Sequence, residues 1–192
     1  MGEFEKWHGL GNDFIVTSEA VEPELARSLC DRHRGVGADG VLVVQEHEGI
    51  WTMVVLNSDG SRPEMCGNGL RCVVGFLAGQ SKKPQAGNLI VHTDAGAKSC
   101  HYEQQDDGGY LVRVEMGEAA LGESFQAPGH PRPYQLVDMG NPHAVSFEPF
   151  EDAEVDLEGP AVESALPGGA NVEFVRVSDE GKRLEVVVWE RG

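Results

Sequence analysis

The sequence predicts an α+β protein built from two similar lobes. Strand-like runs greatly outnumber helical runs, and their order is not the regular alternation of strand and helix found in parallel α/β folds. The two halves also echo one another, because Gly11-Asn12 and Gly140-Asn141 each lead into an apolar strand. A Gly- and Pro-rich stretch at 116–134 is interpreted as the crossing between the halves. We therefore expect lobes at residues 1–118 and 119–192.

Two helices are readable. The first is expected over residues 22–35, with Pro23 at the first helical position and Gly35 as a stop signal. The second runs from about residue 67 to 78, where apolar residues recur with the spacing of one helical face: Leu70, Val73, Val74 and Leu77.

Almost all other segments with a pattern are predicted to be strands. They are rich in β-branched and aromatic residues, and the runs are 41–46, 51–57, 89–93, 110–116, 143–147, 172–177 and 184–190. Hairpin turns are expected around Asp107-Gly108 and around Gly181.

Composition and charge exclude several classes of function. The chain has 15 basic and 32 acidic residues, so its net charge of −17 would repel nucleic-acid phosphates. The N-terminus lacks a signal-peptide pattern, and no apolar run approaches the roughly 20 residues of a membrane span. The four cysteines form no C-x-x-C pair. We expect a soluble, cytoplasmic protein with reduced thiols that binds neither nucleic acid nor membranes.

The motifs for nucleotides and metals are weak or absent. Residues 35–40 match G-x-G-x-x-G, but they follow a helix and open a strand, which inverts the context that dinucleotide binding requires. The sequence contains no P-loop, no H-E-x-x-H and no Cys/His set with metal-ligand spacing. We therefore predict neither a nucleotide site nor a metal site.

Cys66 is the first candidate for chemistry, because it stands at the start of the second predicted helix. The unpaired N–H groups and the positive dipole of a helix N-terminus favour a thiolate and can hold a carboxylate. Gly67 and Gly69 let a bound group approach the backbone, and Asn68 adds a neutral donor and acceptor. A buried structural thiol is an equal alternative on position alone. Cys30 and Cys72 are interpreted as core residues.

Other polar residues invite the same question. Asn12, Asn57, Asn141 and Asn171 lie at strand ends, where asparagine commonly forms turns. His143 would usually be an ordinary strand histidine, and Glu190-Arg191 a solvated strand end. Taken singly, none of these residues indicates a site.

Together, however, these residues resemble the diaminopimelate epimerase family. The resemblance covers essentially the whole chain in seven ordered blocks: WHGLGNDFIV, RHRGVGADG, NSDGSRPEMCGNGLRC, TDAGAK, DMGNPHAV, GANVEFV and WERG. It implies two lobes, each a β-barrel-like mixed sheet around a central helix, with the substrate between them. It also implies a cofactor-independent isomerase, in lysine and peptidoglycan precursor biosynthesis, that interconverts LL- and meso-diaminopimelate. Members of this family often pair, so a homodimer is one expectation of the resemblance.

The resemblance also assigns roles to residues. Cys66 matches one of two catalytic cysteines, and Gly67 with Asn68 matches the carboxylate site at the helix start. His143 and Glu190 match residues that tune the cysteine pKa values. The remaining residues match substrate contacts, to which Glu190 also belongs: Asn12, Asn57, Asn141, Asn171 and Arg191.

The sequence departs from the family after Glu190-Arg191-Gly192. In the family this segment continues to an Ala-Cys-Gly-Thr-Gly motif, which carries the second cysteine and begins the second central helix. The internal repeat agrees, because the spacing from Asn12 to Cys66, measured from Asn141, points just past Gly192. We therefore expect the second lobe to be incomplete, the apolar strand face at 184–189 to be uncovered, and the chain to be inactive alone.

Two alternatives remain open. The first is a relative with the same cysteine pair that racemises another amino acid, such as proline or histidine, although proline-type relatives usually carry His where this chain has Asn68. The second is a non-catalytic protein that binds a diamino acid in its first lobe. Epimerisation is expected to need a base on one face of the α-carbon and an acid on the other, supplied by one thiolate and one thiol.

Overall fold

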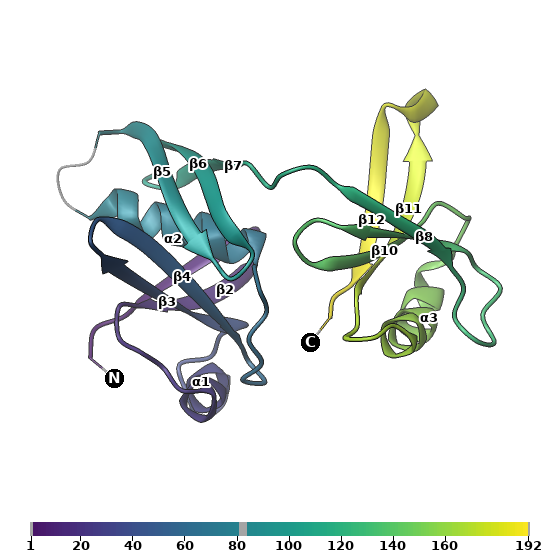
Figure 1. The fold of residues 1–192 in the computed structure, drawn as a ribbon, viewed down its shortest axis with the longest axis horizontal. Coiled ribbons are helices and arrows are strands. Elements are labelled where there is room, and N and C mark those ends of the chain that lie inside the picture. Colours follow the sequence, from purple (N-terminus) through teal and green to yellow (C-terminus); the bar gives the residue numbers. More distant parts are fainter. Residues whose placement is uncertain (1, 81–83, 192) are drawn as a thin grey trace. The chain divides into compact units, whose positions relative to one another are not determined.

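The computed structural model describes residues 2–80 and 84–191 (Figure 1). The chain divides into two compact units, Met1–Met116 and Gly117–Gly192. Within the described residues, twelve strands form two mixed sheets and helices are few. The predicted α+β class with two sheet lobes is therefore confirmed. No helix in the described residues is long and apolar enough to cross a membrane.

The first unit contains a seven-stranded sheet whose strands follow one another in chain order. Most neighbours are antiparallel, but β2 pairs with β3 and β4 with β5 in parallel. The strands are β1 (Glu5–Gly9), β2 (Asn12–Thr17), β3 (Gly40–His47), β4 (Ile50–Asn57), β5 (Ala86–Thr93), β6 (Gly96–Gln104) and β7 (Tyr110–Val114).

Helix α2 (Gly67–Gly79) is the centre of this unit and contacts all seven strands, so the sheet curls around it (Figure 1). Because strand side chains alternate between faces, Leu42 and Val55 point toward α2 and join its core. Val41 and Leu56 point the other way, toward α1 (Pro23–Cys30). The central helix was predicted as 67–78, and α2 confirms it.

Helix α1 is shorter than predicted, since it ends at Cys30 rather than near Gly35. The Asp31 carboxylate accepts the N–H groups of His33 and Arg34, which turns the chain out of the helix. The chain then folds back, and a Cβ on Gly35 would lie 2.2 Å from the Ser28 carbonyl oxygen. Gly35 therefore permits a close return over the last turn, after the helix has already ended.

The second unit contains a five-stranded sheet in the order β12-β11-β10-β9-β8. Its strands are β8 (Ala120–Phe125), β9 (Tyr134–Asp138), β10 (Pro142–Ser146), β11 (Asn171–Ser178) and β12 (Arg183–Trp189). Strand β8 lies inside the stretch 116–134 that was interpreted as a crossing, so that interpretation was wrong for Ala120–Phe125. The predicted hairpin turns are confirmed between β6 and β7 and between β11 and β12.

Helix α3 (Asp152–Ala165) was not predicted from the sequence. It packs against β11 and β12. Its start is a capping box, in which Glu151 and Glu154 accept one another's backbone N–H groups. Gly159 and Pro160 lie within it and obscure the helical pattern. Gly159 is required by packing, because a Cβ there would lie 2.5 Å from the Trp189 ring.

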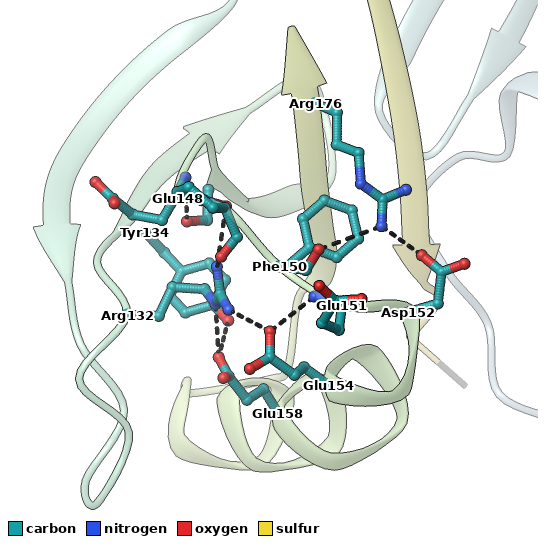
Figure 2. A network of polar contacts seen from close by, with 11 residues as sticks. Arg132, Tyr134, Glu148, Phe150, Glu151, Asp152, Glu154, Glu158 and Arg176 are labelled. Carbon is teal, nitrogen blue, oxygen red and sulfur yellow. Dashed lines mark hydrogen bonds and ion pairs between the residues drawn. The ribbon is translucent and has the colours of Figure 1, made fainter.

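A buried polar network fastens α3 to its sheet (Figure 2). The Arg132 guanidinium donates at 2.9 Å to Glu158 Oε2 and at 2.9 Å to Glu154 Oε2. The Tyr134 hydroxyl donates to the same Glu158 oxygen at 3.0 Å. Near the network, Arg176 lies 3.9 Å over the Phe150 ring. In this network the buried Arg132 side chain is thus paired with two carboxylates of α3.

The two units repeat one plan, strand–strand–helix–strand–strand. In the first, β2, α1 and β3 form a parallel crossover with Phe14 opposite Gly40. In the second, β10, α3 and β11 do the same with His143 opposite Asn171. Gly40 and Asn171 therefore occupy equivalent positions in the two units. When the units are aligned on these residues, the strand pairing makes Trp51, Met53 and Val55 of β4 equivalent to Leu184, Val186 and Val188 of β12.

These matched triplets have different surroundings. Met53 and Val55 are buried in the α2 core, and Trp51 packs against it. Their counterparts Leu184, Val186 and Val188 are 57%, 47% and 42% exposed. The strand face predicted to be uncovered is therefore exposed.

Candidate active site

Cys66 is the N-cap residue of α2, with an extended backbone (φ −135°, ψ 115°) and a half-buried side chain. Its Sγ accepts the Gly69 N–H at 3.4 Å, and its carbonyl accepts the Leu70 N–H at 2.8 Å. The N–H groups of Gly67 and Asn68 precede these two, so helix geometry gives them no intrahelical acceptor. The thiol therefore lies beside two backbone donors that can receive a carboxylate.

Close packing at the start of α2 explains Gly69 and Gly9. A Cβ on Gly69 would lie 2.9 Å from a Leu42 methyl group, so the first turn can press onto β3 only without a side chain. A Cβ on Gly9 would lie 3.0 Å from the Asn68 carbonyl oxygen, so the end of β1 can pass the helix start. Gly67 has open space at this position.

The other three cysteines are core residues, as predicted for Cys30 and Cys72. Their exposed fractions are 4% for Cys30, 2% for Cys72 and 2% for Cys100. Burial raises the pKa of all three thiols, to about 12 for Cys72 and about 11 for Cys100. Cys66 is thus the one partly exposed thiol among the four.

Two asparagine amides lie next to Cys66. Asn12 begins β2, and its Oδ1 is 4.0 Å from Cys66 Sγ and 3.5 Å from Asn68 Nδ2. Asn68 Oδ1 accepts from Arg71, one helical turn further along α2. The structure therefore brings together three predicted site residues from segments more than fifty positions apart.

An ionic cluster lies behind Asn12. Asp39 Oδ2 accepts from Asn12 Nδ2 and from the Asp13 N–H, both at 2.9 Å. Arg32 donates to both Asp13 and Asp39 at 2.7 Å, and Lys6 donates to Asp13. The Arg32 guanidinium holds the pKa of Asp13 well below its usual value.

Asn57 lies in the same unit and is the last residue of β4, where the loop that leads to Cys66 begins. Its Nδ2 donates to Ser61 Oγ at 2.9 Å, and its backbone N–H donates to the Ser61 carbonyl at 2.9 Å. Further along, Arg62 pairs with Asp94 through two hydrogen bonds of 2.6 and 2.8 Å. These contacts fix the approach to Cys66, so Asn57 has a structural role whether or not it contacts substrate.

In the second unit, three polar groups form a chain on the sheet face opposite α3. His143 Nδ1 lies 2.6 Å from Glu173 Oε1, and its Nε2 lies 3.0 Å from Asn141 Oδ1. The other carboxylate oxygen, Glu173 Oε2, is buried and has no hydrogen-bond partner among the described residues. Glu173 therefore orients the predicted site residue His143.

The remaining predicted residues lie at the ends of β11 and β12. Asn171 Oδ1 accepts the Arg191 N–H at 2.9 Å, so these two predicted substrate contacts are joined. The Arg191 side chain donates to the Gly168 carbonyl at 3.2 Å. Glu190 is exposed and lines an open pocket with Glu163, Val188 and Trp189.

Sequence reasoning missed Asp39, Arg71 and Glu173, which contact predicted site residues directly. Glu173 had a weak signal, since it interrupts the apolar run Val172–Val175. Arg71 follows Asn68 by three positions, the spacing at which helical side chains meet. Asp39 gave no signal, because its contact with Asn12 depends on the crossover through α1.

Comparison with known proteins decides the family. The family model described as diaminopimelate epimerase matches residues 4–122. The diaminopimelate epimerase of Nostoc punctiforme is 40% identical over 99% of this chain and 77% of its own length. That of Desulfitobacterium hafniense is 38% identical over 99% of this chain and 76% of its own length. The chain belongs to the diaminopimelate epimerase family.

The fold of this diaminopimelate epimerase family member also recurs in more distant enzymes. A probable proline racemase from Agrobacterium radiobacter matches with a TM-score of 0.70 at 16% identity, over 96% of this chain and 69% of that one. A hydroxyproline epimerase from Agrobacterium vitis matches with a TM-score of 0.68 at 14% identity, over 96% and 68%. At such low identity these two matches show the fold alone. The named diaminopimelate epimerases are isomerases, and they support an amino-acid epimerase activity.

Proposed function

We propose that this chain supplies Cys66 as one of two thiols that move the α-proton of 2,6-diaminopimelate, in the conversion of the LL form to the meso form without pyridoxal phosphate. The observation that carries the proposal is the position of Cys66. Its sulfur accepts a backbone N–H at the start of α2, and two oriented amides lie beside it. The membership of the diaminopimelate epimerase family supports the substrate.

The chemistry requires the protein to stabilise a carbanion, because the α-proton of an amino acid is only weakly acidic. The N–H groups of Gly67 and Asn68 would bind the α-carboxylate, where the positive end of the α2 dipole offsets the charge that develops in the transition state. Cys66 Sγ would then lie on one face of the α-carbon and remove or return the proton.

The second unit would hold the rest of the substrate. His143, which Glu173 orients, and Glu190 would together tune the pKa of a thiol at the opposite face of the α-carbon. Asn141, Asn171 and Arg191 would contact the polar groups of the substrate. Asn12 and Asn57 would do the same from the first unit.

Inversion needs an acid on the other face of the α-carbon, since a single base would return the proton to the face from which it removed it. All four cysteines lie in the first unit, and three of them are buried core thiols. We therefore propose that a polypeptide of these 192 residues alone does not produce the meso form.

Two measurements test the proposal. The chain is incubated with LL-diaminopimelate in D₂O, and the expected result is no meso product above background; its formation would contradict the proposed single thiol. Separately, alkylation of Cys66 is followed in the presence of LL-diaminopimelate, proline or histidine. Protection by diaminopimelate alone is expected. Stronger protection by proline or histidine would point to a different amino-acid racemase, and Cys66→Ala is the control for labelling elsewhere.

A further inference from the structure

The two asparagine amides beside Cys66 are each fixed by a charged group. Asp39 is a carboxylate, which accepts hydrogen bonds, so the Asn12 atom 2.9 Å away must be the NH₂ nitrogen. Arg71 only donates, so Asn68 must turn its oxygen toward that guanidinium. Between these two anchors, the Asn68 NH₂ group meets the Asn12 oxygen at 3.5 Å. Asp39 therefore fixes the orientation of the Asn12 amide, and Arg71 fixes that of the Asn68 amide. In these orientations the Asn68 NH₂ group faces the Asn12 oxygen.

A turn of the Asn12 amide would be opposed at both ends. It would place the Asn12 oxygen against the Asp39 carboxylate and its NH₂ group against the Asn68 NH₂ group. Each contact would then join two acceptors or two donors. In the observed orientation Asn12 presents only its oxygen to Cys66 Sγ, at 4.0 Å.

We propose that Asp39 is a positioning residue for the Cys66 thiol, because it holds the Asn12 oxygen toward the sulfur. An oxygen at this place accepts from the S–H form and disfavours the thiolate, whereas the Gly69 N–H favours the thiolate. The two contacts balance the sulfur between its protonated and ionised states, which suits a group that must both take and return a proton. The inference rests on the proposed role of Cys66.

The ionisable groups near this arrangement include the buried Cys72 thiol, which interacts electrostatically with Cys66. Arg71 lies on α2, and Lys6, Asp13, Arg32 and Asp39 form the cluster behind Asn12. Asp39 contacts the Asn12 amide and Asp13 does not, although both side chains accept from Arg32.

The test measures the rate of Cys66 alkylation by iodoacetamide against pH in the intact chain. Asp39→Ala removes the acceptor and the charge, whereas Asp39→Asn removes the charge but keeps one acceptor oxygen. We expect the midpoint of the Asp39→Ala profile to lie about half a pH unit below that of Asp39→Asn. Without Asp39, the Asn12 amide keeps only the longer 3.5 Å contact with Asn68, so it can turn its NH₂ group to the thiolate. In an Asn12→Ala background this difference should disappear.

Two outcomes would overturn the inference. One is a single midpoint for Asp39→Ala and Asp39→Asn; the other is a difference that persists without the Asn12 side chain. Because the assay reads thiol ionisation, a failure of the epimerase proposal would leave its result unchanged.

A second measurement needs no substitution at Asp39. The side-chain amide protons of Asn12, assigned by their loss in Asn12→Ala, should resonate downfield of exposed asparagines and exchange slowly with water. Positions and exchange rates equal to those of exposed asparagines would contradict the contact with Asp39.

Discussion

Arg32 in the first unit and Arg132 in the second are each held by two carboxylates, but their surroundings differ. The Arg32 side chain is 54% exposed, and its partners Asp13 and Asp39 lie beside the candidate site. The Arg132 side chain is 8% exposed and lies against α3, where it contacts Glu154 and Glu158 (Figure 2). Similar ion pairs therefore have different roles: the exposed set contacts the Asn12 amide of the candidate site, whereas the buried set holds a helix to a sheet.

The largest difference is expected when each arginine is replaced by methionine. Arg132→Met leaves the Glu158 carboxylate, whose side chain is 12% exposed, without its cationic partner and should destabilise the second unit by about 3–5 kcal/mol. Arg32→Met should cost the first unit about 1 kcal/mol or less, because exposed pairs are screened by solvent. Hydrogen exchange in each unit during urea unfolding measures both losses. Equal losses would refute the distinction between the two networks.

The next largest contrast is in the reactivity of the cysteine thiols. It lies within the first unit, because the second unit contains no cysteine. Near neutral pH, alkylation of Cys66 should be at least about a hundredfold faster than that of Cys30, Cys72 or Cys100, since their burial limits both access and ionisation. Peptide mapping after brief labelling of the native chain gives the four rates. Similar labelling of Cys66 and Cys72, which share α2, would contradict the assignment of a reactive helix-terminal thiol.

The two networks also predict opposite responses to pH. The pKa of Asp13 is lowered by Arg32, so its stabilisation is present above about pH 4 and is lost as pH falls through the lower folded value. The pKa of Tyr134 is raised by burial and by Glu158, so its stabilisation is present below about pH 10 and is lost as pH rises.

We therefore expect the first unit to weaken in acid and the second in alkali, by about 1 kcal/mol each. Denaturant unfolding from pH 2 to 11 tests this, and Asp13→Asn and Tyr134→Phe should each flatten one limb only. A variant that flattens neither limb would show that its group does not couple ionisation to folding.

The smallest effect concerns matching turns in the two units. Leu10, which precedes Gly11, adopts the left-handed region (φ 56°) and is 89% exposed. Its counterpart Met139, which precedes Gly140, does not have a positive φ. Leu10→Asn should raise stability by about 0.5–1 kcal/mol, because asparagine tolerates this conformation. Glu48→Asn, in the similar turn Glu48-Gly49, should gain as much, and Met139→Asn should gain nothing. Chemical denaturation of the three variants decides the point.

The sequence predicted much of the fold because its patterns are local. Leu70, Val73, Val74 and Leu77 mark one face of α2, and the β-branched runs mark most of the strands. It failed where tertiary contacts override the pattern. Helix α3 contains Gly159 because Trp189 packs against that position, and the capping of α1 at Asp31 depends on one side chain rather than on Gly35.

The candidate site was predictable in its residue types but not in its geometry. The asparagines and Cys66 were found from their positions at element ends and from the family resemblance. Their mutual orientation could not be, because it depends on Asp39, Arg71 and Glu173, whose contacts arise only when distant segments meet.

Cys66 also occupies a capping position that Ser, Thr, Asp or Asn usually fill. Sulfur accepts hydrogen bonds less well than oxygen, so α2 begins with a weaker cap than the backbone allows. Serine there should fasten the helix more firmly and raise the melting temperature, yet it would lack a proton that can leave near neutral pH. In the proposed function, the Cys66 sulfur therefore has two roles that conflict. It caps α2 less firmly than an oxygen would, but it can act as an acid and a base near neutral pH.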